Sequence, residues 1–121
     1  MTQAASLASV GSSALSWGGA PAAAWVNFDG TLSGTITPRA SFNVTNITKN
    51  GTGDYTLNFT TAMPNTNYVT VAMCSTDSSA PTFVNMQGTT GAVTTSSVRI
   101  QTNTTVGSVN RTTITVAIFS L

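Results

Sequence analysis

The chain has 121 residues, enough for one domain with a single hydrophobic core, and only seven of them are charged: four Lys or Arg and three Asp, with no Glu and no His. Four scattered cations form no basic patch, which argues against binding to nucleic acid or to an anionic membrane surface. Acid–base catalysis lacks its usual residues, so we expect no enzyme and no catalytic residue.

The cysteine content and the overall charge set further limits. Cys74 is the only cysteine, so it forms no internal disulfide and no cysteine pair can hold zinc; we expect a buried thiol, no metal and no cofactor. A net charge of +1 gives little self-repulsion, which favours association into a homo-oligomer. No apolar run approaches membrane-spanning length, and the N-terminal stretch lacks the features of a secretory signal, so neither membrane insertion nor secretion is expected.

Residues 1–20 are rich in Ala, Ser and Gly and carry no charge. This composition is typical of an extended arm, and we expect an arm that docks on a neighbouring subunit or on a larger shell. The alternative is an arm that folds back on its own domain. The folded domain is expected over residues 21–121.

The first half of this domain carries clear strand and turn signals. A strand is predicted over 25–28 and ends at Asp29-Gly30, a common turn dipeptide. A short edge segment is predicted over 35–37, before Pro38. A hairpin follows. Phe42 and Val44 alternate with polar neighbours, Ile47 is shifted by one residue as in a β-bulge, residues 50–54 turn, and residues 55–59 return with alternating apolar side chains.

The second half continues with strands predicted over 68–74, 82–86, 93–102 and 111–121, and with loops over 75–81, 88–91 and 104–110. In the strand over 68–74, Val69, Val71 and Met73 share one face. The last strand has apolar residues on both faces, with Ile118 on one and Phe119 on the other. A second sheet or another subunit is therefore expected to cover each face.

About seven or eight strands at intervals of 8–12 residues predict an all-β fold, an antiparallel, jelly-roll-like β-sandwich with an extended N-terminal arm. A small barrel of jelly-roll type is the alternative.

The polar motifs favour structural roles. Asp29, Asp54 and Asp77 lie in turn contexts, where the Asp side chain bonds nearby backbone amides, and no calcium-loop signature surrounds them. Six Asn residues match the glycosylation sequon: Asn43, Asn46, Asn50, Asn58, Asn103 and Asn110. Because Thr and Ser make up about a third of the chain, we interpret these matches as polar strand faces.

Aromatic residues suggest where subunits meet. We expect subunit contacts at Trp17, Trp25, Phe28 and Phe119, because aromatic side chains dominate interface energetics. Stacking of the two Trp rings on sugars is the alternative. The candidate exposed binding residues lie in polar loops: Thr76, Asp77, Thr89, Thr90, Asn103 and Asn110.

Several segments resemble one known group of proteins. These are Ala23-Ala24-Trp25-Val26-Asn27-Phe28-Asp29-Gly30-Thr31, then Ala40-Ser41-Phe42-Asn43-Val44 with Ile47, then the run from Asn50 to Phe59, and finally Ala62-Met63-Pro64-Asn65-Thr66-Asn67-Tyr68. Together they span about residues 22–73 and are similar to the tail-fibre and virion surface β-modules of tailed bacteriophages. The resemblance implies a β-rich homotrimer on the virion, with no catalytic residues.

These observations lead to one functional expectation. The chain is expected to be a non-enzymatic virion protein, assembled in the host cytoplasm, that acts as a trimeric fibre or receptor-binding module. Because only about twenty residues precede the resembling block and no shaft is present, a head-decoration role stays open. The expected partners are further copies, other virion proteins and a host surface glycan or receptor. A free carbohydrate-binding lectin is the alternative, and a depolymerase is a third and weaker one.

Overall fold

The computed structural model describes residues 21–77 and 80–121, and these residues form ten strands and no helix. Accordingly, no helix that could cross a membrane occurs among them. The strands are β1 (Ala24–Phe28), β2 (Thr35–Ile36), β3 (Ala40–Phe42), β4 (Val44–Gly51), β5 (Asp54–Phe59), β6 (Val69–Cys74), β7 (Phe83–Met86), β8 (Ser97–Thr104), β9 (Gly107–Ser108) and β10 (Ile114–Phe119).

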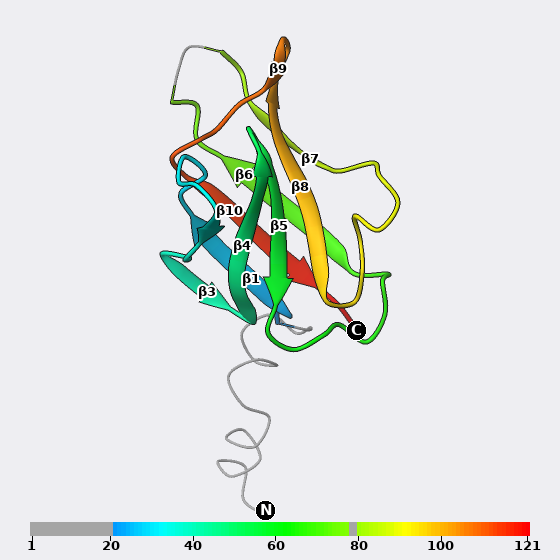
Figure 1. The fold of residues 1–121 in the computed structure, drawn as a ribbon. Coiled ribbons are helices and arrows are strands. Elements are labelled where there is room, and N and C mark those ends of the chain that lie inside the picture. Colours follow the sequence, from blue (N-terminus) through cyan, green and yellow to red (C-terminus); the bar gives the residue numbers. More distant parts are fainter. Residues whose placement is uncertain (1–20, 78–79) are drawn as a thin grey trace, which may run out of the picture.

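The strands form two antiparallel sheets that lie face to face (Figure 1). One sheet has four strands in the order β3-β1-β10-β6. The other has the order β2-β4-β5-β8-β7, with β9 paired to β8. The predicted antiparallel β-sandwich is therefore confirmed. The short edge segment predicted over 35–37 is β2. The strand count exceeds the prediction because β3 is separate from β4, and because the two-residue β9 lies in a stretch that was expected to be a loop.

Alternating side chains from the two sheets form one core. β1 and β10 bury residues such as Val26, Phe28 and Ile114, while β5 contributes Tyr55 and Leu57. The rings of Phe28 and Tyr55 meet edge to face, with centroids 5.2 Å apart, and so join the sheets. Burying each of these apolar side chains contributes roughly 1.5–3 kcal/mol, which makes the core the main source of stability.

The hairpin predicted after residue 40 is correct in its second part and wrong in its first. The β4–β5 register shifts between Val44 and Asn46, which buries both Val44 and Ile47 and confirms the predicted bulge. Phe42 does not belong to this hairpin. It lies in β3, which pairs with β1, because Asn43 adopts a left-handed φ of 56° and turns the chain from one sheet to the other.

Strand β6 has its larger apolar side chains on the outside. Val69, Val71 and Met73 face solvent, while the smaller Thr70, Ala72 and Cys74 alternate with them and are partly buried. Cys74 is thus only half-buried, not fully buried as the sequence led us to expect. This partial burial raises the pKa of the Cys74 thiol.

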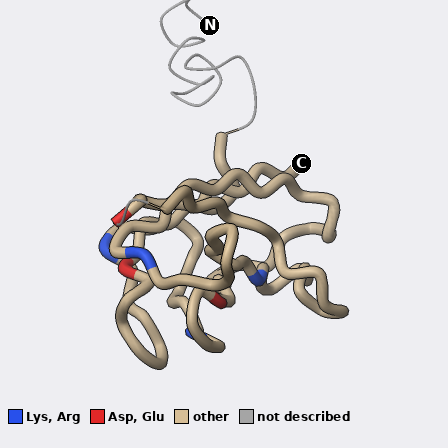
Figure 2. The backbone as a smooth tube through the Cα atoms, turned by 90° about the horizontal axis from the view of Figure 1, so that it is seen from above, with Lys and Arg blue, Asp and Glu red and all other residues tan. Residues whose placement is uncertain are grey.

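Charged residues of both signs lie close together at one side of the fold, and others lie apart from them (Figure 2). Their side chains bind neighbouring loops. Asp29 accepts a 2.9 Å hydrogen bond from the Thr31 amide, which confirms its turn role, and pairs with Arg39 at 3.3 Å. Lys49 donates from Nζ to two backbone carbonyls of the 29–34 loop. The other charged residues make contacts that include Asp54–Arg99, Asp77–Thr112 and Arg111–Thr82. Each charge therefore has a partner within its own chain.

Candidate functional site

The exposed side of the four-stranded sheet is apolar over most of its area. Strand pairing brings Phe42, Trp25, Ala117 and Val71 into one row across β3, β1, β10 and β6. We call this surface the outer face; it comprises Trp25, Phe42, Val69, Val71, Met73, Ala117 and Phe119. The six large side chains are 41–73% exposed. Such a contiguous apolar surface is uncommon on a monomer and typically marks a contact site.

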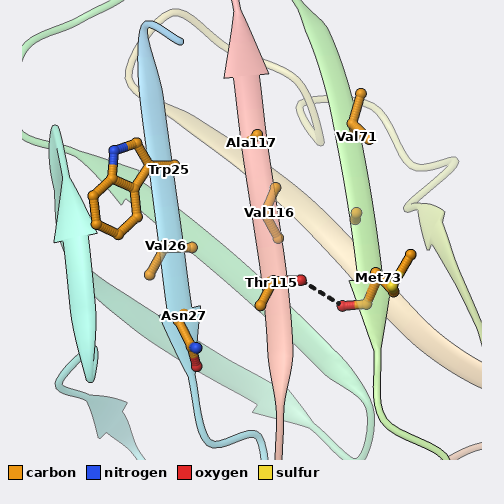
Figure 3. Close-up of a pocket in the computed structure, with 9 residues that line it drawn as sticks. Trp25, Val26, Asn27, Val71, Met73, Thr115, Val116 and Ala117 are labelled. Carbon is orange, nitrogen blue, oxygen red and sulfur yellow. Dashed lines mark hydrogen bonds between the residues drawn. The ribbon is translucent and has the colours of Figure 1, made fainter.

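The centre of the outer face is a shallow groove of about 510 Å³ (Figure 3). Trp25, Ala117 and Val71 lie on three adjacent strands, and Met73 borders the groove on β6. Among the described residues, the groove is lined by the polar side chains of Asn27 and Thr115 and by the Trp25 indole, which carries one N–H donor. The Thr115 hydroxyl donates to the backbone carbonyl of Met73 at 3.3 Å. The groove thus presents few hydrogen-bonding groups to a ligand.

A second hollow of about 320 Å³ continues the outer face at one end. It is lined by Val69 of β6 and Phe119 of β10, which are paired residues, and by Leu121. Polar residues of the turn before β6 and of the C-terminal stretch complete the lining. Leu121 is almost completely exposed. The apolar surface therefore reaches the end of the sheet at which β10 finishes.

Charge is confined to the margin of the outer face. Arg39 precedes β3, and its Nη1 lies 3.3 Å from Oδ1 of Asn27 and 3.5 Å from the hydroxyl of Thr113. Its Nη2 pairs with Asp29, whose pKa is lowered mainly by hydrogen bonds from Thr31. The face itself carries no charged side chain, so a partner needs no complementary charge.

The expected subunit anchors have different locations. Trp25 and Phe119 lie on the outer face, each 41% exposed. Phe28 is fully buried against Tyr55, so it is a core residue, and the expectation that it contacts another subunit is wrong. Trp17 lies outside the described residues. The sequence placed Val69, Val71 and Met73 on one face, but alternation alone does not reveal which face points to solvent.

The expected binding residues do not form one cluster. Thr76, Asp77, Thr89 and Thr90 are exposed. Asn103 lies within β8 and is partly buried, contrary to its prediction as an exposed loop residue. Because Phe83 pairs with Asn103 and Met86 with Ile100, the loop after β7 lies at the opposite end of β8 from Asn103.

Asn110 is likewise partly buried, not exposed as expected. Its side-chain oxygen accepts a 2.9 Å hydrogen bond from the Gly53 amide and lies 3.1 Å from the Tyr55 hydroxyl. Asp77 is exposed, but both of its carboxylate oxygens accept bonds from Thr112. These two side chains therefore hold the loops around β10.

The ionisable groups of the described chain support local structure. Hydrogen bonds, chiefly from Arg99, lower the pKa of Asp54, and those from Thr112 and Ser75 lower the pKa of Asp77. Burial raises the pKa of Tyr55 to about 12. Within residues 21–77 and 80–121, no group of three or more Cys or Asp residues could hold a metal ion. The described carboxylates are thus stable anions at neutral pH.

Comparisons of the chain with protein-family models, with curated proteins and with solved structures find no match. The outer face is therefore the structural feature of the described chain that bears most directly on function.

Proposed function

We propose that this chain is a non-enzymatic structural protein of a tailed-phage virion, and that its copies associate through the outer face. The phage assignment is supported by the resemblance over residues 22–73. Self-association is supported by a single observation: six large apolar side chains are 41–73% exposed on a sheet face without charge. The protein then serves as a trimeric surface fibre or receptor-binding module, or as a head-decoration protein.

The energetics favour burial of the outer face in an assembly. Removing a half-exposed apolar side chain from water contributes roughly 1 kcal/mol. Six such side chains on each subunit oppose the loss of translational and rotational freedom on association. Since no charged group must be desolvated, this gain is not offset by an electrostatic penalty.

The path of the chain is compatible with an N-terminal anchor. Ala24 pairs with Ile118, and the Ala23 amide donates to the Ile118 carbonyl at 2.7 Å. The described chain therefore enters β1 at the end of the sheet that carries Val69 and Phe119 (Figure 1). In the proposed function this segment docks on a neighbouring subunit or on the particle, which is assembled in the host cytoplasm.

The lectin alternative is less well supported. Trp25 offers a partly exposed ring, but sugar recognition also requires several directed polar groups, and the described part of the groove offers few beyond Asn27 and Thr115. Glycan-array binding by the oligomer that disappears in Trp25→Ala while assembly persists would favour this alternative.

The oligomeric state of the full chain tests the proposed association. Light scattering coupled to size-exclusion chromatography should give an oligomer for the unmodified protein and a monomer for the double variant Val71→Thr/Met73→Thr. Threonine suits an exposed strand, so the circular dichroism of the variant should not change. The matched control is Phe83→Thr, which removes a similarly exposed apolar side chain from β7 in the other sheet and should leave the oligomer intact.

A monomeric unmodified protein at micromolar concentration would contradict the proposal, as would an oligomer that persists in the double variant. The virion assignment is tested separately, by immunogold electron microscopy of intact particles with an antibody against the purified chain. Labelling at the tail fibres or on the head supports the assignment, and unlabelled particles overturn it.

A further inference from the structure

The two edge strands of the four-stranded sheet, β3 and β6, differ in length, and within residues 21–77 and 80–121 no further strand pairs with either of them. β6 is six residues long, pairs with β10 without a register shift, and contains no charged residue, Pro or Gly. It therefore lacks the sequence features, such as a charged residue, Pro or a bulge, that normally protect an edge strand. β3 has three residues and follows Pro38 and Arg39. Of the edges of the other sheet, β2 has two residues and β7 closely follows Pro81.

The strand directions allow these two edges to join. Three antiparallel steps separate β3 from β6, so the two strands run in opposite directions. When copies are related by rotation about an axis along the strands, β6 of one copy is antiparallel to β3 of the next. Such a contact is heterologous, and repeated contacts of this type form a ring when the rotation between copies closes and an open filament when it does not.

The side chains at the two edges also match. The row of Phe42, Trp25, Ala117 and Val71 begins and ends with an apolar residue, and Phe42 and Val71 are 55% and 56% exposed. If β6 and β3 of adjacent copies pair, these end residues become cross-strand neighbours, with Cβ atoms about 5 Å apart. The row then continues from one copy to the next.

The size of the outer face indicates that its edges take part. Four strands at about 4.8 Å spacing and six residues at about 3.4 Å rise give a footprint of roughly 400 Å². A stable interface usually buries about 800 Å² on each partner. The face alone is therefore small for a stable assembly, and pairing at both edges enlarges the contact.

The width of the sheet determines the number of copies. If each four-stranded sheet forms one wall of a prism, each wall is about 19 Å wide. The central axis then lies roughly 5 Å from each wall in a prism of three sheets, and about 10 Å from each wall in a prism of four sheets. Packed sheets lie about 10 Å apart, so the side chains of each sheet fill roughly 5 Å. The sheets of three copies thus enclose a core that their apolar side chains fill, whereas the sheets of four copies would leave an open channel.

We propose that three copies of this chain form a closed ring in which β6 of each copy pairs with β3 of the next, with the three outer faces directed toward the axis. This inference rests on the proposed self-association and specifies its geometry. The partner of the outer face is thus the same face on two further copies, and Trp25 and Met73 fill the space around the axis.

Cysteine cross-linking of the full chain tests this geometry. In a Cys74→Ser background, Phe42→Cys is combined in turn with Val69→Cys, Val71→Cys or Met73→Cys, because the register between copies can differ by two residues. After oxidation with copper phenanthroline, at least one double variant should give a covalent trimer on a non-reducing denaturing gel. Each single-cysteine variant should remain a monomer. The matched control, Thr35→Cys on β2 with Val71→Cys, should also remain a monomer.

Other results would overturn the proposal. Covalent dimers from Val71→Cys alone would indicate two-fold pairing of β6 with β6. The absence of cross-links in all three double variants, in a protein that still forms an oligomer by light scattering, would exclude the ring but not self-association. A monomeric unmodified protein would instead refute the proposed function itself. Circular dichroism confirms that each variant is folded, and amide exchange of the unmodified oligomer, slowed in β3 and β6, provides a readout without substitutions.

Discussion

The hydroxyl of Tyr55 donates to the carbonyl of Gly30 over 2.8 Å, and this close approach leaves no room for a side chain at position 30. An added Cβ would lie 2.5 Å from the Tyr55 oxygen and 2.6 Å from Cδ1 of Ile114. We expect Gly30→Ala to lower the free energy of unfolding by about 1–3 kcal/mol, measured by urea denaturation. Gly51→Ala is the control, since nothing lies within 4 Å of an added Cβ there. Equal effects of the two substitutions would contradict the steric argument.

The same tyrosine predicts how stability changes at high pH. Burial raises the pKa of Tyr55 to about 12, whereas a tyrosine in the unfolded chain ionises near 10. The unfolded state thus loses this proton first, and stability should fall between about pH 10 and 12, by up to roughly 3 kcal/mol. Chemical denaturation at a series of pH values measures this decline, which should be smaller in Tyr55→Phe. A decline of the same size in that variant would assign it to other groups.

The Asp54–Arg99 ion pair should contribute more than the Asp29–Arg39 pair to the loss of stability at low pH. Its carboxylate accepts two bonds from Arg99, at 2.8 and 2.7 Å, and these hold the pKa of Asp54 below its usual range. Because the pKa of Asp54 is lower in the folded state than in the unfolded state, the ion pair stabilises the fold fully above the unfolded-state pKa, which is near 4. This stabilisation is lost as the pH falls through the folded-state pKa. Stability should therefore be nearly constant from about pH 5 to 8, because the chain has no His.

The variant Asp54→Asn tests this assignment. It should be about 1 kcal/mol less stable at pH 7 and should lose less stability on acidification, as measured by urea denaturation. Asp29 and Asp77 also have lowered pKa values, so part of the acid response should remain. An unchanged acid response would mean that the ion pair contributes nothing to folding.

Asn43 connects segments that are distant in the sequence, and its loss should destabilise the fold. Its amide nitrogen donates to the carbonyls of Ala23 and Thr61, at 3.1 and 3.0 Å, and its oxygen accepts from the Thr61 amide. Its backbone also has a φ of 56°. We expect Asn43→Ala to lower the free energy of unfolding by about 2–3 kcal/mol, and Asn43→Gly by less, because Gly adopts this φ without strain. The comparison separates backbone strain from hydrogen bonding; equal losses would exclude a strain contribution.

The proposed oligomer should be insensitive to salt. The outer face has no charged side chain, so screening between about 50 and 500 mM NaCl should change the dissociation constant less than about threefold. Sedimentation velocity at low micromolar concentration measures this constant. Marked weakening by salt would point to an interface that includes Arg39 or other charged residues.

Sequence patterns predicted the fold well because most strands of this protein bury a single face. In β5 and β10, alternating residues such as Leu57 and Val116 point into the core, as their spacing indicates. The position of Phe42 could not be predicted in this way. Its phase agrees with that of Val44, but the left-handed Asn43 between them moves the chain to the other sheet, and a residue pattern does not encode that change.

The candidate site was harder to predict than the fold. Trp25 and Phe28 lie in one strand and are both aromatic, yet Trp25 faces solvent and Phe28 is buried, because their separation of three residues places them on opposite faces. Asn110 was expected to be exposed because it lies in a polar loop, but its partners Gly53 and Tyr55 are more than fifty residues away in the sequence. Contacts at that range depend on tertiary structure.

The inverted pattern of β6 affects how this strand finds its place during folding. Burial of the larger apolar side chains would favour a shift of the β6–β10 register by one residue, because that shift would turn Val71 and Met73 into the core and Ala72 to the solvent. Hydrogen bonds just before and just after β6 oppose that shift of register. Before β6, the Tyr68 hydroxyl bonds to the Thr94 carbonyl at 2.8 Å; after it, the Ser75 amide bonds to the Thr113 carbonyl at 2.9 Å. These two hydrogen bonds therefore fix the register of β6 against β10. Weakening either of them should produce molecules in which β6 is shifted by one residue before it reduces the stability of the core.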